Sequence, residues 1–314
     1  MANTLNYATI FQQELDKKFV HDSVTAWMGR NAQLAQYNGG REIKIPKLDM
    51  DALADYSRST GYTEGDVTLE YETRTMTRDR GRGFTLDNQD VNETNFVANA
   101  AAVMGEFQRT KVVPEVDAYN LSTVYSKVPS ANRETYTPAA ASVFGKLKDE
   151  IAAVQDKVGT GVRLMIHITY AVQSLLDRST EFTRQVSLLD LGGNLSTKVK
   201  GLDNNPLLPT SAALMQTAFN FWAGKADTST GEDPAKVYTD KAAGGFEKKA
   251  DAKPIHWLII PENAPIAVCK QDTVRTFTPL TWQKANAWHC DYRRYFDLFI
   301  PDNKLEGLYA CIGS

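Results

Sequence analysis

The sequence predicts an α+β protein in which a compact middle region carries long extensions. Helical and strand patterns alternate along the 314 residues without the strand–helix–strand repeat of a parallel sheet. Two short apolar runs, 162–168 and 256–261, are typical of buried strands. An extended segment at 41–87 alternates like a strand but has too few apolar side chains to form its own core. We therefore expect the compact region to span 136–272.

The composition is that of an ordered chain without a strong charge bias. Hydrophobic residues make up 42% and charged residues 23%, and the net charge is −3. A sequence-specific DNA-binding protein is usually basic, so that class is disfavoured. Cys269, Cys290 and Cys311 are odd in number and widely spaced, which favours reduced thiols over a disulfide framework. The sequence shows no signal peptide and no apolar run of about 18 residues, so we expect a soluble protein made in a cytoplasm.

The N-terminal region predicts a short helix at 7–20. Its apolar residues recur every four positions and form a narrow stripe, which suits docking on a larger surface better than anchoring a core. The stripe consists of Tyr7, Phe11, Leu15 and Phe19. The following residues, 23–40, predict a loop or a second short helix that ends at the turn Asn38-Gly39-Gly40.

Residues 41–87 predict an extended hairpin. The segment REIKIPKL alternates, and Pro46 places it at the edge of a sheet. The segment 68–87, TLEYETRTMTRDRGRGFTLD, also alternates, but neither face is apolar. Leu69 and Tyr71 share one face with threonines, and acidic and basic residues share the other. Such a strand is not expected in the core of its own subunit.

The same segment carries an unusual cluster of arginines. They are Arg74, Arg78, Arg80 and Arg82. Aromatic residues are not interleaved with them as in nucleic-acid-binding surfaces, and the chain is acidic overall. The planar guanidinium group pairs bidentately with carboxylates, so we expect contacts with another copy of the chain. The alternative is an ordinary solvated strand.

Two helices are predicted next. The long one, within 91–135, has an apolar stripe that includes Phe96, Met104 and Phe107, and Pro114 predicts a break or kink. The other opens at Thr137-Pro138 and ends at Gly159. Its expected buried stripe is Val143, Leu147, Ile151, Val154 and Val158.

The rest of the chain predicts shorter elements. We expect a helix at 171–179, a hairpin at 187–200 that turns at Gly192-Gly193, a possible helix at 211–222, a polar surface excursion at 223–254, a strand at 265–269, and two long strands within 285–312 that turn at 301–303.

No catalytic, cofactor or metal site is predicted. His167 lies in an apolar strand and is most simply a core histidine. His289 and Cys290 are adjacent strand residues that point to opposite faces, so they cannot easily share a metal. No phosphate-binding glycine loop or nucleophile motif occurs, and Gly81-Arg82-Gly83 is better explained by turn geometry than by phosphate binding. An α+β cytosolic enzyme with an unrecognised site is the alternative from another class.

The order of these parts resembles a known family across essentially the whole chain. The segments GREIKIP, FQRTKVVPEVDAY and YRRYFDLFIPDNKLEGLY carry the resemblance most specifically. The chain resembles the major capsid proteins of tailed bacteriophages, which have the Hong Kong 97-type fold. The resemblance implies an N-terminal arm at 1–40, an extended E-loop at 41–90, a P-domain with its long spine helix at 91–135, an A-domain at 136–272, and the C-terminal strands of the P-domain at 273–314.

The resemblance also implies a function. Such proteins assemble into hexamers and pentamers of an icosahedral head that encloses double-stranded DNA, and their E-loop lies across a neighbouring subunit. It implies inter-subunit contacts by Arg74, Arg78, Arg80, Arg82 and Tyr71 of the E-loop, and by Tyr7, Phe11 and Leu15 of the arm. The alternative within the same fold is an encapsulin-type shell of a bacterial nanocompartment.

Partners and location follow from the same resemblance. The predicted arm helix starts within ten residues of Met1, so we expect a separate scaffolding protein. A portal protein, possible decoration proteins and non-specific contact with packaged double-stranded DNA are also implied. The location would be the virion, with assembly in the host cytoplasm and no membrane.

Some relatives cross-link their subunits through an isopeptide bond between an E-loop lysine and a P-domain asparagine. In this sequence the corresponding groups would be sought at Lys44 and Lys47, and at Asn286 with Asp291 as the assisting carboxylate. The sequence favours the simpler interpretation of surface lysines and a strand-edge asparagine.

Overall fold

The computed structural model describes most of the chain outside the N-terminus. The described residues are 23–34, 36–37, 40–87, 104–179, 187–190, 198–224 and 244–313. The predicted arm helix with Tyr7, Phe11 and Leu15 lies outside them. The first part of the predicted long helix and most of the polar excursion also lie outside, so these predictions stay untested. Among the described residues, no helix combines the length and apolar character needed to cross a bilayer.

A seven-stranded mixed sheet forms the centre of the compact region. Its order is β5-β15-β12-β6-β9-β8-β7, in which β15–β5 and β6–β9 pair in parallel and the other pairs are antiparallel. The strands are β5 (Arg133–Thr135), β6 (Leu164–Thr169), β7 (Ser187–Asp190), β8 (Lys198–Leu202), β9 (Asn205–Thr210), β12 (Ile255–Pro261) and β15 (Tyr309–Ile312). The mixture of parallel and antiparallel pairs confirms the predicted α+β class.

The two faces of this sheet build two separate cores. Successive side chains of a strand point to opposite faces. Trp257 and Ile259 of β12 accordingly pack with helix α5 (Val143–Val158), whereas Leu258 and Ile260 pack with the spine helix, α4 (Val113–Lys127). The predicted stripe of α5 is confirmed, because four of its five residues are fully buried and Val158 packs at the edge. The predicted helix at 171–179 is confirmed as α6 (Tyr170–Asp177).

The long helix is distorted where its sequence predicts distortion. It is helical from residue 104, and a π-helical segment, η2 (Gln108–Val112), precedes Pro114 in the first turn of α4. Proline lacks a backbone N–H, and its ring crowds the preceding turn, so a locally widened turn accommodates it.

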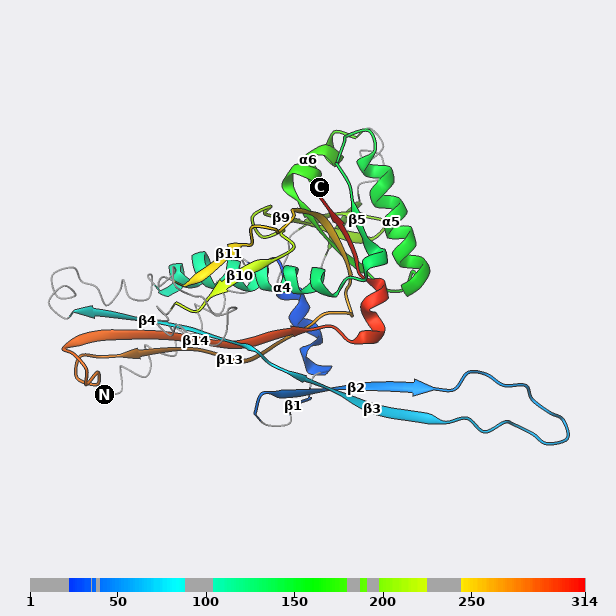
Figure 1. Ribbon diagram of the computed structural model, residues 1–314, viewed down its shortest axis with the longest axis horizontal. Helices are drawn as coiled ribbons and strands as arrows, with labels where there is room; N and C mark the ends of the chain where they lie inside the picture. Colours follow the sequence, from blue (N-terminus) through cyan, green and yellow to red (C-terminus); the bar gives the residue numbers. More distant parts are fainter. Residues whose placement is uncertain are drawn as a thin grey trace.

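Three smaller sheets extend from the compact region. Figure 1 shows β4, β14 and β13 running side by side below α4, and the β2–β3 hairpin extending beyond them at the other end of the molecule. The first sheet, of order β13-β14-β4, consists of β4 (Arg78–Asp87), β13 (Ile266–Phe277) and β14 (Ala287–Phe299). The second, of order β1-β2-β3, consists of β1 (Gln36–Tyr37), β2 (Glu42–Met50) and β3 (Val67–Thr75). The third pairs β10 (Phe219–Trp222) with β11 (Gly245–Lys248).

Several boundaries differ from those that the sequence predicts. The segment 68–87 is not one strand, because the chain leaves β3 at Met76-Thr77 and enters a different sheet as β4. The tail does turn after Ile300, at η6 (Asp302–Gly307), but β14 and β15 lie in different sheets and do not pair with each other. The helix predicted from Pro138 begins only at Val143.

The prediction of a possible helix at 211–222 is wrong. This region contains turns and ends in β10, whose aromatic residues pack against Phe246 of β11. Cross-strand aromatic contacts of this kind stabilise a small sheet more than the weak helical pattern could stabilise a helix. The predicted hairpin at 187–200 is confirmed by the antiparallel pairing of β7 and β8, and its turn lies outside the described residues.

Two buried polar side chains hold the described N-terminal segment on the core. Asp117 of α4 accepts hydrogen bonds from Ser23 Oγ at 2.7 Å and Thr25 Oγ1 at 2.6 Å. His167 is fully buried and accepts a 3.2 Å hydrogen bond at Nε2 from Trp27 in η1 (Ala26–Leu34). Burial lowers the pKa of His167 to about 3, so the ring is neutral, as the prediction of a core histidine requires.

A buried carboxyl group makes the compact region sensitive to pH. Glu150 of α5 is 2% exposed; its Oε2 accepts a hydrogen bond from Trp257, and its Oε1 has no hydrogen-bond partner. The nearest ammonium, Lys146 Nζ, lies 3.8 Å from Oε1 and also pairs with Glu134. Burial raises the pKa of Glu150 to about 7 because desolvation outweighs the Trp257 hydrogen bond and the Lys146 charge.

We therefore expect Glu150→Gln to flatten the pH dependence of stability. Since the folded-state pKa is raised, the contribution of this group is fully present below its ordinary pKa of 4.5 and is lost as pH rises through about 7. The wild type should lose roughly 3 kcal/mol more than the variant between pH 4 and pH 8. Urea unfolding of the unassembled subunit at both pH values measures this difference. Parallel pH profiles for the two proteins would contradict the assignment.

Candidate functional site

The base of the β2–β3 hairpin is anchored in the body of the molecule. Ile43 and Ile45 of β2 are 0% and 5% exposed, and they form one apolar cluster with residues of β13 and β14. Met76, at the end of β3, joins the same cluster and is 1% exposed. The apolar side chains nearest the body therefore have partners within the subunit.

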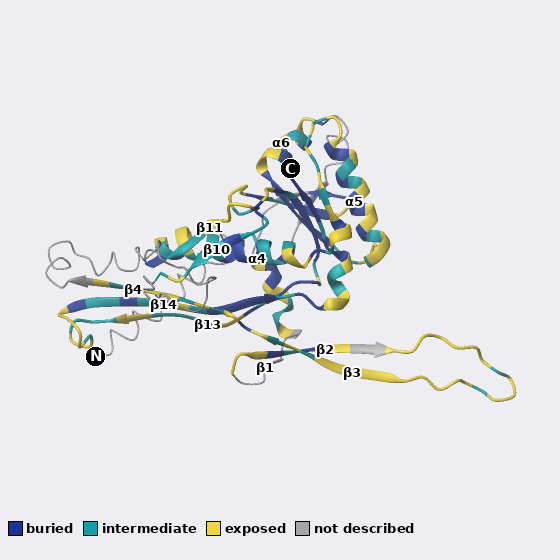
Figure 2. Ribbon diagram, in the orientation of Figure 1, coloured by how far each residue is buried: buried dark blue, intermediate teal, exposed yellow. Residues whose placement is uncertain are grey.

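The rest of the hairpin exposes its apolar side chains. Nine large apolar side chains in the described part of the chain are strongly exposed, and seven of these lie within 50–71, a segment that we call the hairpin tip. The seven are Met50, Leu53, Tyr56, Tyr62, Val67, Leu69 and Tyr71. In the ribbon of Figure 2, most of the described residues of the hairpin beyond its base have the colour of exposed residues. A concentration of exposed apolar groups marks a surface that contacts another molecule.

The backbone of residues 51–66, between the ends of β2 and β3, also has few hydrogen bonds within the chain. Between the ends of β2 and β3, the backbone hydrogen bonds are Asp51 to Asp66 and a reciprocal pair between Ser57 and Gly61. In addition, β3 is the outer strand of its sheet, so one edge of its backbone is open for pairing. Ordering such a loop costs conformational entropy that its own contacts do not offset. Contacts with a second molecule can supply the free energy that offsets this entropy cost.

A buried aspartate fixes the point where the hairpin ends and β4 begins. Asp297 of β14 is 4% exposed and accepts hydrogen bonds from Thr77 N at 2.7 Å and Thr77 Oγ1 at 3.0 Å. Its other oxygen accepts a 2.5 Å hydrogen bond from the Tyr119 hydroxyl of α4. Asp297 therefore ties the start of β4 to the spine helix and sets where the hairpin leaves the body.

The second half of the arginine-rich segment has partners within its own subunit. The Arg78 guanidinium lies 4.5 Å from the ring centre of Tyr119 and 4.6 Å from that of Phe221. Arg80 pairs with Glu115 at 2.6 Å and donates to the Trp222 carbonyl. The interpretation that the whole segment lacks support in its own subunit is therefore wrong for β4, because its inner face lies on α4 and β10.

The first half of the segment, β3, is mostly exposed, and Tyr71 is 47% exposed. Arg74 nevertheless also has partners within the subunit, because it pairs with Glu72 and, at 2.9 Å, with the exposed Asp302. Arg82 belongs to β4 but is itself exposed. The predicted inter-subunit contacts of these arginines and of Tyr71 stay predictions. Tyr71 was among the predicted contact residues, whereas Leu53, Tyr56 and Tyr62 of the hairpin tip were missed because isolated apolar residues in a polar loop show no periodicity.

Arg78 and Arg74 should differ sharply when each is replaced by alanine. Arg78→Ala removes a cation stacked between two rings, so we expect a loss of about 2 kcal/mol in the free energy of unfolding. Arg74→Ala removes partly exposed ion pairs with Glu72 and Asp302 and should cost about 1 kcal/mol or less. Chemical denaturation of the unassembled subunits measures both. Equal losses in the free energy of unfolding would show that stacking of Arg78 on Tyr119 and Phe221 stabilises the subunit no more than the ion pairs of Arg74 do.

The candidate cross-link residues lie at opposite ends of the molecule. Lys44 and Lys47 belong to β2, whereas Asn286 directly precedes β14 at the end remote from the hairpin (Figure 1). Asp291 is held by Arg275 through two hydrogen bonds of 2.9 and 2.8 Å. A bond between these groups would have to join two copies, and it stays a prediction.

The described residues show neither a metal-ligand cluster nor a disulfide bond. Within the described ranges, no three His, Cys, Asp or Glu side chains gather as metal ligands. The three cysteines all lie in described strands, and none forms a disulfide. Burial raises the pKa of the Cys290 thiol, and it also raises that of Cys311 above its usual range.

Comparison with known proteins finds likeness in structure but not in sequence. No protein-family model matches the chain, and no curated protein matches it. The capsid of cyanophage P-SCSP1u matches with a TM-score of 0.57 and 9% identity, over 89% of this chain and 85% of that one. The mature capsid of bacteriophage PhiM1 matches with a TM-score of 0.53 and 10% identity, over 88% and 83%. The capsid of Staphylococcus phage Andhra matches with a TM-score of 0.51 and 12% identity, over 91% and 84%.

These matches cover nearly all of this chain and most of each phage capsid chain with which it was aligned. At such low identities they establish the fold and not the function. The mixed α+β architecture, with its protruding hairpin and long sheet beneath a spine helix, is therefore the fold of phage capsid proteins.

Proposed function

We propose that this protein is the major capsid protein of a tailed bacteriophage. Copies of it assemble into hexamers and pentamers that form an icosahedral head around double-stranded DNA, without any catalytic step. Closed symmetry of this kind requires heterologous contacts, in which one patch of a subunit meets a different patch of the next. The fold is shared with phage capsid proteins, and that likeness supports the proposal.

The observation that carries the proposal is the hairpin tip. Seven exposed apolar side chains, four on the paired ends of β2 and β3 and three on the weakly bonded loop between them, are costly in a monomer but useful in an assembly. The base of the hairpin is packed and its tip is not, so the tip is presented to a neighbour from a fixed anchor. An extended segment that gains its contacts on docking suits a shell that forms from separate subunits.

The domains and partners belong to the same proposal. The hairpin corresponds to the E-loop, α4 with the β13-β14-β4 sheet to the P-domain, and the seven-stranded sheet with α5 and α6 to the A-domain. We assign the final strand, β15, to the A-domain, although the sequence placed it with the C-terminal strands of the P-domain; its pairing in the seven-stranded sheet supports this assignment. A separate scaffolding protein, a portal protein, decoration proteins and packaged DNA are the expected partners in the virion and its host.

Electron microscopy of the expressed protein tests the proposal. The purified chain, alone or together with the scaffolding protein that we propose, should form shells or rings of five or six copies. Sizing in solution should show the same species. A protein that remains strictly monomeric under all of these conditions would overturn the proposal.

A further inference from the structure

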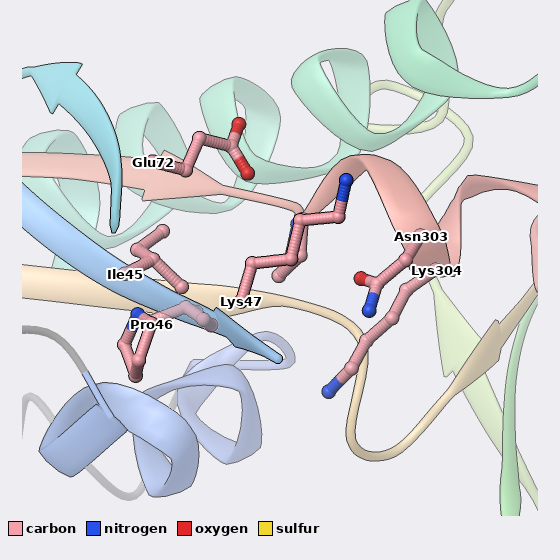
Figure 3. Close-up of a pocket in the computed structure, with 8 residues that line it drawn as sticks. Ile45, Pro46, Lys47, Glu72, Asn303 and Lys304 are labelled. Carbon is pink, nitrogen blue, oxygen red and sulfur yellow. The ribbon is translucent and has the colours of Figure 1, made fainter. Parts of the chain in front are cut away.

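Charged groups at the base of the hairpin remain partly exposed to water. Figure 3 shows the recess between β2 and η6, which has a volume of about 90 Å³ and is bordered by Lys47, Glu72 and Lys304. None of these three residues is buried. Water screens exposed charges, so a change in their protonation has little effect on the fold. The ionisable cluster beside α5 differs, because it contains the buried carboxyl group of Glu150.

One ammonium group serves two carboxyl groups where α5 lies beside β5 (Figure 1). Lys146 Nζ of α5 donates a 2.6 Å hydrogen bond to Glu134 Oε2 of β5. The same Nζ lies 3.8 Å from Oε1 of Glu150, which follows one turn later on α5. The Tyr309 hydroxyl of β15 also donates to Glu134 Oε2, at 2.7 Å. Glu134 thus accepts two hydrogen bonds with its Oε2 atom, whereas Glu150 Oε1 accepts none.

The surroundings of Glu150 place its change of charge near neutral pH. Burial raises the pKa of Glu150 to about 7, although its Oε2 accepts a hydrogen bond from the fully buried Trp257. The other ionisable groups that act on it, of which one is a cation, are Lys146, Glu134, Tyr309 and Cys311. The hydrogen bonds from Lys146 and Tyr309 hold the pKa of Glu134 below its usual range. Near neutral pH, Glu134 is therefore ionised, while Glu150 changes between its two protonation states.

We propose that Lys146 acts as a proton-controlled clasp between α5 and β5. While Glu150 is protonated, Lys146 stays on Glu134 and the clasp is closed. When Glu150 loses its proton, its buried carboxylate needs a counter-ion and draws Lys146 inward, so Glu134 keeps only the Tyr309 hydroxyl. The edge strand β5 then loosens, because three residue pairs with β15 remain to hold it. This switch lies within one subunit and does not depend on the proposed function.

The indole N–H of Trp257 reports the charge of Glu150, to which it donates a hydrogen bond. In the unassembled full-length subunit with isotope-labelled tryptophan, the indole NMR signal that is missing from Trp257→Phe should titrate with a midpoint near pH 7. Glu150→Gln should abolish this titration. The ring centre of His256 lies 6.3 Å from that of Trp257, and burial lowers the pKa of His256, so its own effect falls at lower pH and persists in Glu150→Gln. A signal that shows no titration near neutral pH would overturn the proposal.

Two variants with opposite effects distinguish a shared cation from a structural lysine. Lys146→Met removes the cation beside Glu150, so the midpoint should rise by roughly one pH unit. Glu134→Gln removes a like charge and frees Lys146, so the midpoint should fall by roughly half a pH unit or more. The matched control is Lys148→Met, because Lys148 is about as exposed as Lys146 on the same helix but pairs with Asp203. It should leave the midpoint unchanged. Equal midpoints in all three variants, or shifts of the same sign in the first two, would refute the sharing of Lys146.

Hydrogen exchange measures the clasp itself. The amide of Tyr136, directly after β5, donates to the Ile312 carbonyl of β15. After correction for the intrinsic exchange rate, its protection in the wild type should fall by roughly threefold or more from pH 6 to pH 8, because one ion pair is lost. In Glu134→Gln, which has no clasp, this amide should be weakly protected at both pH values. A fall in Glu134→Gln as large as that in the wild type would show that Lys146 does not hold β5.

Discussion

A chain in which residues 51–66 are replaced by Asn-Gly should fold normally and fail to assemble. Met50 and Val67 are paired residues at the end of the hairpin, so a two-residue turn can join them. The change removes Leu53, Tyr56 and Tyr62, none of which is buried in the subunit. Each such side chain, once buried against a neighbour, contributes about 1.5–3 kcal/mol. Their loss at every contact of a shell should abolish particle formation.

Two measurements separate folding from assembly in this variant. Its thermal unfolding as an unassembled subunit should match that of the wild type, because the packed base of the hairpin is retained. Electron microscopy should show no shells at concentrations where the wild type forms them. Shells of normal size and yield from the shortened chain would contradict the role that we give to the hairpin tip.

Asp297→Ala should produce the largest loss of subunit stability. The substitution leaves the Tyr119 hydroxyl and the Thr77 backbone N–H without their acceptor near the core, where both are now hydrogen-bonded. Removing one member of such a buried polar network costs roughly 3–5 kcal/mol, a large part of the typical stability of a domain. We expect a strongly lowered urea midpoint, or no soluble subunit.

Asp302→Ala is the matched control for that experiment. Asp302 is an exposed aspartate, because its side chain is 66% exposed, and it pairs with Arg74. Its replacement should change the free energy of unfolding by less than about 1 kcal/mol. Should Asp297→Ala also fall within 1 kcal/mol of the wild type, Asp297 would not be what fixes the junction between the hairpin and β4.

The sequence predicted best those features that depend on neighbouring residues. The stripe of α5, the buried strands β6 and β12, and the distortion at Pro114 all follow from periodicity or from the chemistry of one residue. The core position of His167 also follows from the apolar strand around it. These patterns are local, so they are visible without knowledge of the fold.

What the sequence could not show depends on residues far apart in the chain. The break between β3 and β4 is held by Asp297, which lies 220 residues beyond Thr77. The partners of Arg78 come from α4 and β10, so the arginines looked like one exposed cluster although two of them face the body. Leu53, Tyr56 and Tyr62 showed no pattern, because they lie singly in the polar loop between β2 and β3.

Hydrogen exchange at the hairpin tip tests the central claim most directly. Amides of residues 52–56 and 62–65, for which the structure shows no hydrogen-bond acceptor, should exchange nearly as fast as in an unfolded peptide in the free subunit. The same amides should become protected in assembled particles, while those of β12 stay protected in both states. Strong protection of the tip in the free subunit, or no gain of protection on assembly, would contradict the claim that sister copies support it.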